Sequence, residues 1–200
     1  MNPATLSGPQ QALTKRLRAY HPAGPREEEH RRRILAQVVA TPMWWHRDTR
    51  PGHVTGSAFV LDPRLERMLL LHHRKLDRWL QPGGHDDGQQ DPSATALREA
   101  QEETGLTRFA WFGGHPAFFD LDVHVIPALG EVSRHLHLDV RYLLQADPDE
   151  PLILAREEGH ALEWLDLPAA AERMPEEGAR RVMRKIHDLR LVLARLSGSS

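Results

Sequence analysis

The chain contains no cysteine, and this absence excludes several kinds of chemistry. Disulfide bonds, thiolate nucleophiles and cysteine-based zinc sites cannot form. Long apolar runs are also missing, because no stretch approaches the roughly 20 residues that a transmembrane helix needs. The first residues lack the apolar core of a secretory signal peptide. We therefore expect a protein of the reducing cytoplasm without a membrane partner.

An excess of one charge sign is missing too. The 26 lysines and arginines nearly balance the 28 aspartates and glutamates, which gives a net charge of -2. A chain so close to neutrality is not expected to bind nucleic acid or anionic membranes non-specifically. Its 200 residues suit one domain with terminal extensions and allow a substantial core.

Apolar patterning predicts helices near both ends of the chain and strands between them. Residues 10–20 and 26–40 are typical of helices, and Pro42 ends the second one. The expected strands cover residues 53–61, 67–73, 107–112, 118–128, 135–144 and 161–165, and a long amphipathic helix covers 176–196. This pattern favours an α/β sandwich with a mixed sheet. We expect an N-terminal helical extension over residues 1–50 and the main domain over residues 51–200.

Three glutamates share one face of a helix expected between Asp91 and Gly105. Glu99, Glu102 and Glu103 stand at offsets of zero, three and four, so at about 100° per residue they fall in one sector. Such like charges repel by roughly a few tenths of a kcal/mol per pair. A cation would relieve the repulsion, and oxygen ligands favour Mg²⁺, with Mn²⁺ as the alternative. A solvated helix face without metal is the other interpretation of these glutamates alone.

The residues around the acidic cluster favour a binding site. Asp91 is a suitable N-cap, and Gly105 suits the left-handed residue that ends a helix. Arg98 can orient a carboxylate through charge-assisted hydrogen bonds. Gly83 and Gly84 predict a tight turn where the backbone can approach a ligand. A mostly apolar stripe opposite the glutamates would pack on the core: Ala94, Leu97 and Ala100 or Gln101.

The segment from Gly84 to Leu106 resembles the Nudix box, a long motif that ends in R-E-U-x-E-E-x-G-U with U aliphatic. Gln90 stands where the motif has its first glutamate. The chain is therefore similar to Nudix hydrolases over the box, and more loosely over residues 53–167. The matching residues are Gly84, Arg98, Glu99, Glu102, Glu103, Gly105 and Leu106, with Ala100 as a small stand-in at the aliphatic position.

The resemblance implies an α/β/α sandwich that uses a divalent metal. It implies Mg²⁺ ligands at Glu99, Glu102 and Glu103, with the Gly84 carbonyl oxygen as a further ligand. The glutamate that Gln90 replaces has a supporting part in the family, so we expect weaker metal affinity or positioning. Two aspartates in the nearby loop either compensate for that change or are ordinary turn residues: Asp86 and Asp87.

The reaction implied by the resemblance is hydrolysis of a nucleoside diphosphate linked to another moiety, at its P–O–P bridge. Cations offset the phosphate charge that repels hydroxide, and a carboxylate acts as general base or orients the water. That carboxylate is expected to be Glu99 or Glu158, and Glu158 lies in a segment that resembles the family's late acidic loop. Glu157 and Glu163 are alternatives. The expected partner is a small, nucleotide-derived phosphorylated substrate.

Two groups of residues are candidate substrate contacts. Arg74 and Lys75 come shortly before the paired glycines, where they either contact phosphates or form a basic surface loop. On the strand expected over 135–144, polar residues alternate with apolar ones, so one face is core. The other face either contacts the base or sugar of a ligand or faces water. Its candidate contacts are His137, Asp139 and Arg141.

Two other functions are possible for a chain with this fold. Nudix-fold isomerases of isopentenyl diphosphate use a catalytic cysteine, which this chain lacks. A non-hydrolytic nucleotide-binding or regulatory module stays open as the alternative, because loss of box carboxylates would favour it. The N-terminal extension either caps a monomer or contributes to a homodimer, and the sequence leaves both open.

Overall fold

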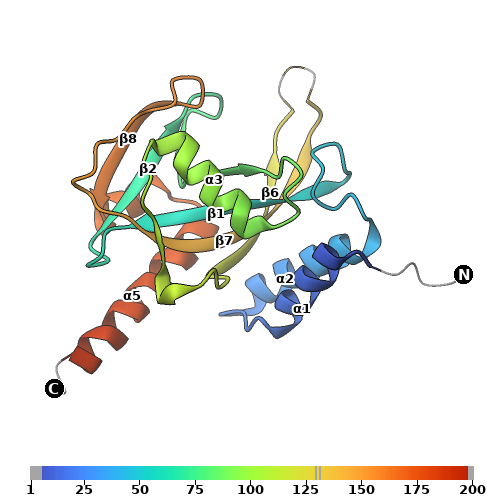
Figure 1. Cartoon of the computed structure of the whole chain (residues 1–200), viewed down its shortest axis with the longest axis horizontal. Coiled ribbons are helices and arrows are strands. Elements are labelled where there is room, and N and C mark those ends of the chain that lie inside the picture. The colour runs from blue at the N-terminus through green and yellow to red at the C-terminus, as the bar shows by residue number, and fades with distance from the viewer. Residues whose placement is uncertain (1–5, 129, 131, 198–200) are drawn as a thin grey trace, which may run out of the picture. The chain divides into compact units, whose positions relative to one another are not determined.

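The computed structural model describes residues 6–128, 130 and 132–197 (Figure 1). Its helices are α1 (Gly8–Ala19), α2 (Pro25–Ala40), α3 (Pro92–Thr104), α4 (Leu167–Arg173) and α5 (Glu177–Ser197), with a short 3-10 helix, η1 (Phe112–Gly114). Its strands are β1 (Gly52–Leu61), β2 (Arg67–His73), β3 (Arg78–Leu80), β4 (Gly83–His85), β5 (Ala110–Trp111), β6 (Asp120–Ile126), β7 (His135–Gln145) and β8 (Gly159–Asp166). Within the described ranges, no helix combines the length and apolar character needed to cross a membrane.

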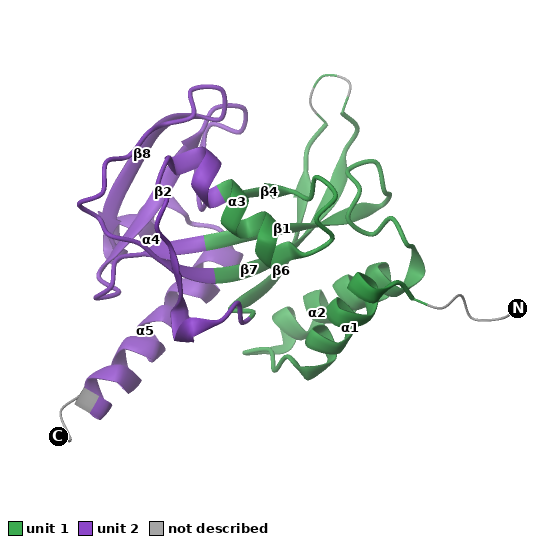
Figure 2. Ribbon diagram, viewed as in Figure 1, with its two compact units in different colours: residues 1–58, 83–99, 118–142 green, residues 59–82, 100–117, 143–200 purple. Residues whose placement is uncertain are grey.

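The strands form one eight-stranded sheet. Hydrogen-bonded neighbours follow the order β3-β2-β1-β7-β5, while β4 pairs with β1, β6 with β7 and β8 with β2. The chain divides into two compact units (Figure 2). Unit 1 comprises Met1–Ala58, Gly83–Glu99 and Phe118–Tyr142, and unit 2 comprises Phe59–Pro82, Ala100–Ala117 and Leu143–Ser200. As a result β1, α3 and β7 each contribute residues to both units.

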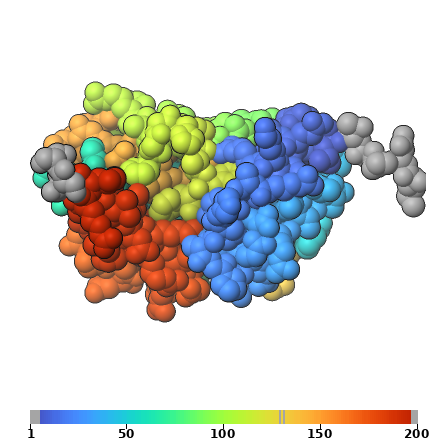
Figure 3. Space-filling view, turned by 90° about the horizontal axis from the view of Figure 1, so that it is seen from below, coloured from blue at the N-terminus to red at the C-terminus, as the bar shows by residue number. Residues whose placement is uncertain are grey.

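In unit 1, the two N-terminal helices lie side by side and α2 packs on β6 (Figure 1). A capping box starts α1: the Ser7 hydroxyl accepts the Gln10 N–H at 3.3 Å, and the Gln10 side chain accepts the Ser7 N–H at 3.0 Å. The outer faces of α1 and α2 form part of the surface, in blue in Figure 3. Their buried faces combine apolar residues, Leu13, Leu17, Ile34 and Val38, with the polar Gln10, Thr14, Glu27 and His30.

A buried glutamate connects these helices to β6. The Glu27 carboxylate, on α2, is fully buried. It accepts hydrogen bonds from the Tyr20 hydroxyl, from the Ala23 N–H at 2.7 Å and from the Leu121 N–H at 3.1 Å. Because a buried carboxylate is costly unless its oxygens are hydrogen-bonded, the Leu121 N–H links α2 to β6, and the Tyr20 and Ala23 donors link it to the connection between α1 and α2.

A buried charge network lies on the polar face of β6 and β7, which pair antiparallel with Asp122 opposite Asp139. The Arg141 guanidinium contacts Asp139 at 2.8 Å, Asp122 at 3.0 Å and Asp120 at 3.4 Å. Burial by itself would raise the pKa of Asp122. The Arg141 charge and hydrogen bonds from His124 and His30 instead hold that pKa well below its usual range. The alternating polar face predicted for residues 135–144 is therefore buried, and it does not face water.

In unit 2, β2 is the central strand, paired antiparallel with β3 on one side and β8 on the other. Its leucines 69–71 are buried, and α5 adds Val182 and Ile186 to the apolar core. The last turns of α5 are exposed, including Leu191, Val192 and Leu196. The indole of Trp79 stacks on His72 at 5.0 Å between ring centroids and lies 4.6 Å from the Arg173 guanidinium carbon.

The structure confirms the expected α/β class, the N-terminal helices and the long C-terminal helix. The division at residue 50 stays a prediction. The tight turn expected at Gly83 and Gly84 is wrong, because both glycines belong to β4, where Gly84 pairs with Gly56. A Cβ at Gly83 would lie 2.6 Å from the Ser57 Cα, so this glycine serves a close strand contact. Helix α4 was not expected, although Asp166 caps it by accepting the Ala169 N–H at 2.8 Å.

The Arg141 network generates a stability prediction. Replacing Arg141 with leucine should lower the free energy of unfolding by about 3–5 kcal/mol, because three buried carboxylates lose their counter-charge. Urea denaturation followed by circular dichroism measures it. In the control Arg184→Leu, an exposed pair with Glu177 at 3.1 Å is removed, and the change should stay below about 1 kcal/mol. Equal effects of the two substitutions would contradict the structural role of the network.

Candidate active site

Helix α3 carries the three glutamates of the acidic cluster, and its expected limits are confirmed. The Asp91 carboxylate accepts the Ser93 N–H at 2.9 Å, and its carbonyl oxygen accepts the Thr95 N–H at 3.0 Å. At the other end, Gly105 has φ of +72° and donates its N–H to the Gln101 carbonyl at 2.9 Å. Left-handed backbone of this kind is open to glycine without steric cost.

The packed side of α3 agrees with the predicted stripe only in part. Ala100 is fully buried and Leu97 half-buried, whereas Ala94 and Gln101 are exposed, and Ala96, which was not predicted, is fully buried. Small residues face inward because β1 approaches closely: a Cβ on Gly56 would lie 3.1 Å from the Ala96 backbone nitrogen. The helix therefore packs on β1 through Ala96 and Ala100, which lie four residues apart on one face.

Gly84 and Glu99 meet at close range in unit 1. A Cβ added to Gly84 would lie 2.7 Å from the Glu99 carboxyl carbon, closer than real side chains come. The absence of a side chain on Gly84 thus lets the Glu99 carboxylate lie directly against the backbone of β4. The Glu99 side chain is only 15% exposed, so this arrangement is well shielded from water.

Arg98 holds the same carboxylate in place. Its Nη2 donates to Glu99 Oε1 at 2.9 Å and to the His85 carbonyl oxygen at 2.7 Å, and it lies 3.3 Å from an Asp87 carboxylate oxygen. One guanidinium therefore links α3 to the strand that carries Gly84. This is the orienting contact expected of Arg98 from the sequence.

The other two glutamates of the cluster differ in exposure. Glu103 is 5% exposed, whereas Glu102 is exposed. Their helical offsets place both in the sector of Glu99, as expected. A buried carboxylate next to an exposed one on the same helix face is compatible with cation binding at the edge of the packed surface.

The loop before α3 explains how Gln90 is accommodated. Its N–H donates to an Asp86 carboxylate oxygen at 3.1 Å, and the Gly88 N–H donates to the same atom at 2.7 Å. Gln90 itself has φ of +54°. Asp86 thus orders the turn, which supports the turn interpretation for this aspartate.

The remaining acidic and basic candidates lie in unit 2. The half-buried Glu158 accepts the Arg74 N–H at 2.8 Å through its backbone carbonyl. Arg74 and Lys75 are exposed in the turn between β2 and β3. Glu157 is exposed, and Glu163 forms an ion pair with Arg173 at 3.6 Å.

Four histidines that sequence reasoning did not bring together meet in unit 1. His137, a predicted substrate contact, lies in a cluster with His53, His85 and His135. Only the His135-x-His137 pair could have been noticed in the sequence, because the other two lie on separate strands. Asp139, two residues further along β7, accepts the Thr55 and Ser57 hydroxyls at 3.0 and 2.8 Å.

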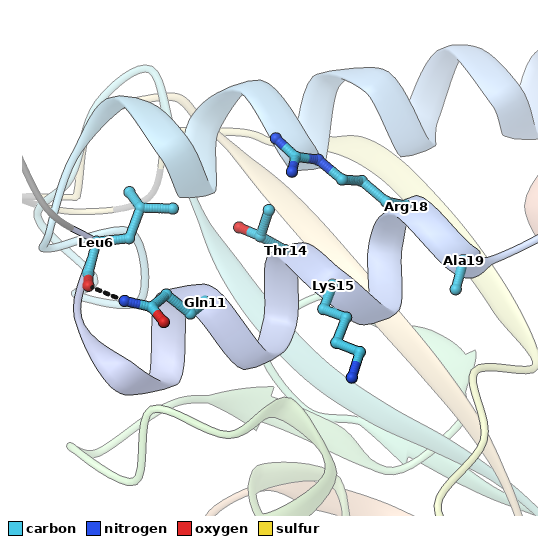
Figure 4. A pocket seen from close by; sticks show the side chains of 6 residues that line it. All are labelled: Leu6, Gln11, Thr14, Lys15, Arg18 and Ala19. Carbon is cyan, nitrogen blue, oxygen red and sulfur yellow. Dashed lines mark hydrogen bonds between the residues drawn. The ribbon is translucent and has the colours of Figure 1, made fainter. Parts of the chain in front are cut away.

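Two hollows on unit 1 contain none of the box residues. The first, of about 440 Å³, is lined by Leu6 and residues of α1 (Figure 4), and in it Gln11 donates to the Leu6 carbonyl at 2.7 Å. The second, of about 650 Å³, has a strongly basic lining that includes Arg26, Arg33, Arg50 and Arg134. The case for the active site therefore depends on the acidic cluster and its partners.

Comparison with known proteins decides the family. Residues 51–186 match the family model described as NUDIX domain. The chain belongs to the Nudix family. The match confirms the resemblance found in the box and includes every candidate site residue from Arg74 to Glu158.

Two curated relatives are similar to this Nudix chain. A Myxococcus xanthus protein described as an octanoyltransferase is 32% identical over 143 residues, which cover 69% of this chain and 38% of the relative. A probable DHNTP pyrophosphohydrolase of Lactococcus lactis subsp. cremoris is 32% identical over 96 residues, covering 47% of this chain and 55% of the relative. The chain thus spans less than two thirds of the length of either relative.

Solved structures support the Nudix fold. A C. elegans Ap4A hydrolase in a binary complex aligns with a TM-score of 0.53 at 19% identity, covering 72% of this chain and 98% of that one. The E. coli dihydroneopterin triphosphate pyrophosphohydrolase aligns with a TM-score of 0.52 at 18% identity, covering 70% and 97%. These likenesses confirm the fold expected from the resemblance.

The contact between Gly84 and Glu99 generates a second prediction. Gly84→Ala should lower the free energy of unfolding by about 1–3 kcal/mol, because the added methyl group displaces the Glu99 carboxylate and breaks its charge-assisted hydrogen bond with Arg98. In the control Gly8→Ala, the new Cβ meets no atom within 4 Å, so stability should stay equal or rise by up to about 1 kcal/mol. If Gly84→Ala unfolds at the wild-type urea concentration, the Glu99 carboxylate is not held against β4.

Proposed function

We propose that this Nudix chain is a metal-dependent pyrophosphohydrolase that cleaves the P–O–P bridge of a nucleoside diphosphate linked to another moiety. The observation that carries the proposal is the Glu99 carboxylate, held against the backbone of Gly84 by Arg98. It begins an acidic cluster in the order that the Nudix box requires. Membership of the family supports the same reaction class.

The residues present fit a hard divalent cation. The donor set would consist of oxygen atoms alone, from Glu99, Glu102, Glu103 and the Gly84 carbonyl, which suits Mg²⁺, with Mn²⁺ as the alternative. When bound, such an ion neutralises phosphate oxygens and lowers the pKa of a bound water. Arg98 orients the Glu99 carboxylate, and the bare backbone of Gly84 lets that carboxylate lie directly against β4.

Glu158 is the proposed group that accepts the proton of the attacking water or orients that water, with Glu99 as the other candidate. Burial lowers the pKa of His73 below its usual value, and the Glu158 charge opposes this shift. The Glu158 carboxylate therefore lies within electrostatic reach of His73. Because Glu158 is only half-buried, it can meet both water and a neighbouring histidine.

The proposed substrate is small and phosphorylated. Both hydrolases named among the similar structures act, by their descriptions, on compounds with phosphate chains, Ap4A and dihydroneopterin triphosphate. Arg74 and Lys75 are exposed and remain proposed phosphate contacts. Substrate contact by His137, Asp139 and Arg141 also remains a prediction, although the last two already serve a buried network.

The cellular setting and association of the chain remain predictions from the sequence. These are a cytoplasmic location, no membrane partner, and either a monomer or a homodimer. A Nudix-fold binding or regulatory module is the alternative function. The neutral Gln90, in place of a glutamate, is the observation that favours it.

Activity against a substrate panel tests the proposed reaction. With Mg²⁺, at least one member of a panel of nucleotide sugars, dinucleoside polyphosphates, ADP-ribose, dihydroneopterin triphosphate and (d)NTPs should release phosphorylated products, separated by ion-exchange chromatography. The double variant Glu102→Gln, Glu103→Gln should lose at least about 10²-fold in kcat/KM, because two anionic ligands of the cation that would neutralise the phosphates are lost.

A matched control removes two exposed charges elsewhere. The double variant Glu172→Gln, Glu177→Gln alters exposed glutamates of α4 and α5 and should keep full activity. Calorimetric binding of a panel member in Mg²⁺, without turnover of any member, would overturn hydrolysis and support the binding module.

The role of Glu158 has its own test. Glu158→Gln should lower kcat by about 10²–10⁴-fold and remove the acidic limb of the pH profile, because the amide cannot accept a proton. Its exposed neighbour provides the control, since Glu157→Gln should leave the pH profile unchanged. A normal acidic limb in Glu158→Gln would assign proton transfer to Glu99 instead.

A further inference from the structure

Four histidines converge in unit 1 from three strands: His53 on β1, His85 on β4, and His135 and His137 on β7. Each histidine offers one ring nitrogen, and these four nitrogens all lie within 4.8 Å of one another. The ring centroids of His53 lie 5.0, 5.2 and 5.1 Å from those of His85, His135 and His137. This group of four imidazoles is separate from the acidic cluster of the Nudix box and contains none of its glutamates.

The strand registers explain why these side chains meet. His85 pairs with Thr55 across β4 and β1, two residues from His53. Since side chains two apart share a face of a strand, His53, Thr55 and Ser57 point to one side of β1. The hydroxyls of Thr55 and Ser57 contact Asp139, which shares its face of β7 with His135 and His137. The histidines therefore continue the buried polar face that contains Arg141.

Hydrogen bonding does not account for the cluster. Within the part of the chain that the structure describes, neither ring nitrogen of the fully buried His53 has a hydrogen-bond partner, and neither has Nε2 of His137. Buried polar atoms without partners are rare in folded proteins, and each one calls for a ligand or another explanation. His135 is already oriented, because its Nδ1 lies 2.8 Å from the Ser133 carbonyl oxygen. That contact leaves Nε2 of His135 available, as in histidines that bind metals.

Burial lowers the pKa of three of these rings, His53, His85 and His137, and so favours their neutral form. Burial, reinforced by the neighbouring His85 and His135, lowers the pKa of His53 to about 3. Burial, reinforced by Arg47 and His135, lowers the pKa of His85 to about 4. Neutral imidazole is the form that binds metal ions. The positive charge of Arg47 is partly offset by its ion pair with Asp87 at 3.5 Å.

We propose that His53, His85, His135 and His137 bind one divalent transition-metal ion of the Zn²⁺ class, in a site that uses no ligand from the acidic cluster. Four nitrogen donors favour Zn²⁺, Co²⁺, Ni²⁺ or Cu²⁺ over Mg²⁺. With metal–nitrogen distances of about 2.0–2.1 Å, tetrahedral ligand atoms stand about 3.3 Å apart, so the rings close inward on loading. Four protein ligands leave no open position, which is typical of a structural ion. In this site His137 would hold the ion and would no longer be a substrate contact.

The site would tie three strands together at one point. Its His85 ligand is the residue after Gly84 and shares β4 with it. An ion held by β1, β4 and β7 would therefore stabilise the strand against which Glu99 is held. Zinc should raise the unfolding temperature of the metal-free chain, because a ligand that binds only the folded state shifts the equilibrium toward it.

Cobalt binding tests the proposal directly. The probe is Co²⁺ added to untagged, full-length chain that has been freed of metal with EDTA and desalted. We expect one equivalent to bind with the visible absorption of tetrahedral Co²⁺, and Zn²⁺, but not excess Mg²⁺, to displace it. The variant His53→Gln, His137→Gln should bind Co²⁺ at least about 100-fold more weakly, because half of the ligands are lost.

Two control variants separate this site from others. His72→Gln, His160→Gln alters a histidine pair of unit 2 whose ring centroids lie 5.6 Å apart, and it should keep the cobalt spectrum. Glu102→Gln, Glu103→Gln should also keep it. Equal cobalt binding by the wild type and the His53→Gln, His137→Gln variant would overturn the proposal. If that variant does not fold, the single variant His85→Gln replaces it, and an unchanged spectrum there would overturn the proposal as well.

Discussion

The contact of the Glu99 carboxylate with the backbone of Gly84 is the constraint on which the candidate active site depends. It brings a strand and a helix so close that no side chain fits between them. The Arg98 guanidinium then bridges the two elements by donating to Glu99 and to the His85 carbonyl. The positive charge of the Arg98 side chain thus holds together carboxylate and carbonyl oxygens that would otherwise repel each other. A bound divalent ion would serve the same electrostatic need more strongly.

The position of β4 depends in turn on the buried polar face of unit 1. β4 pairs with β1 at Thr55–Ser57, and the hydroxyls of Thr55 and Ser57 bind Asp139, which Arg141 neutralises. A network of charges and hydroxyls in this place is more directional than an apolar core, because each group has a defined partner. It thereby fixes the register of the strand that presents Gly84.

The sequence was informative about local structure and much less so about contacts between distant strands. The limits of α3 followed from Asp91 and Gly105, because helix caps depend on the types of a few adjacent residues. The pairing of Gly83 and Gly84 with β1 was missed, since two glycines after a proline look like a turn whether or not another strand lies nearby. The burial of Arg141 was missed for a similar reason: alternation shows that one face is polar, but only the tertiary structure shows what covers it.

The neutral residue at position 90 shows how a motif can change without loss of its scaffold. In the structure, the Gln90 backbone N–H, and not its side chain, connects the loop to Asp86. Asp86 also accepts the Gly88 N–H, so the turn is ordered by a carboxylate that does not come from position 90. Replacing glutamate by glutamine there removes one negative charge while the backbone path into α3 is preserved. The negative charge available to a bound cation would then come from Glu99, Glu102 and Glu103, which the Nudix box places on one face of the helix.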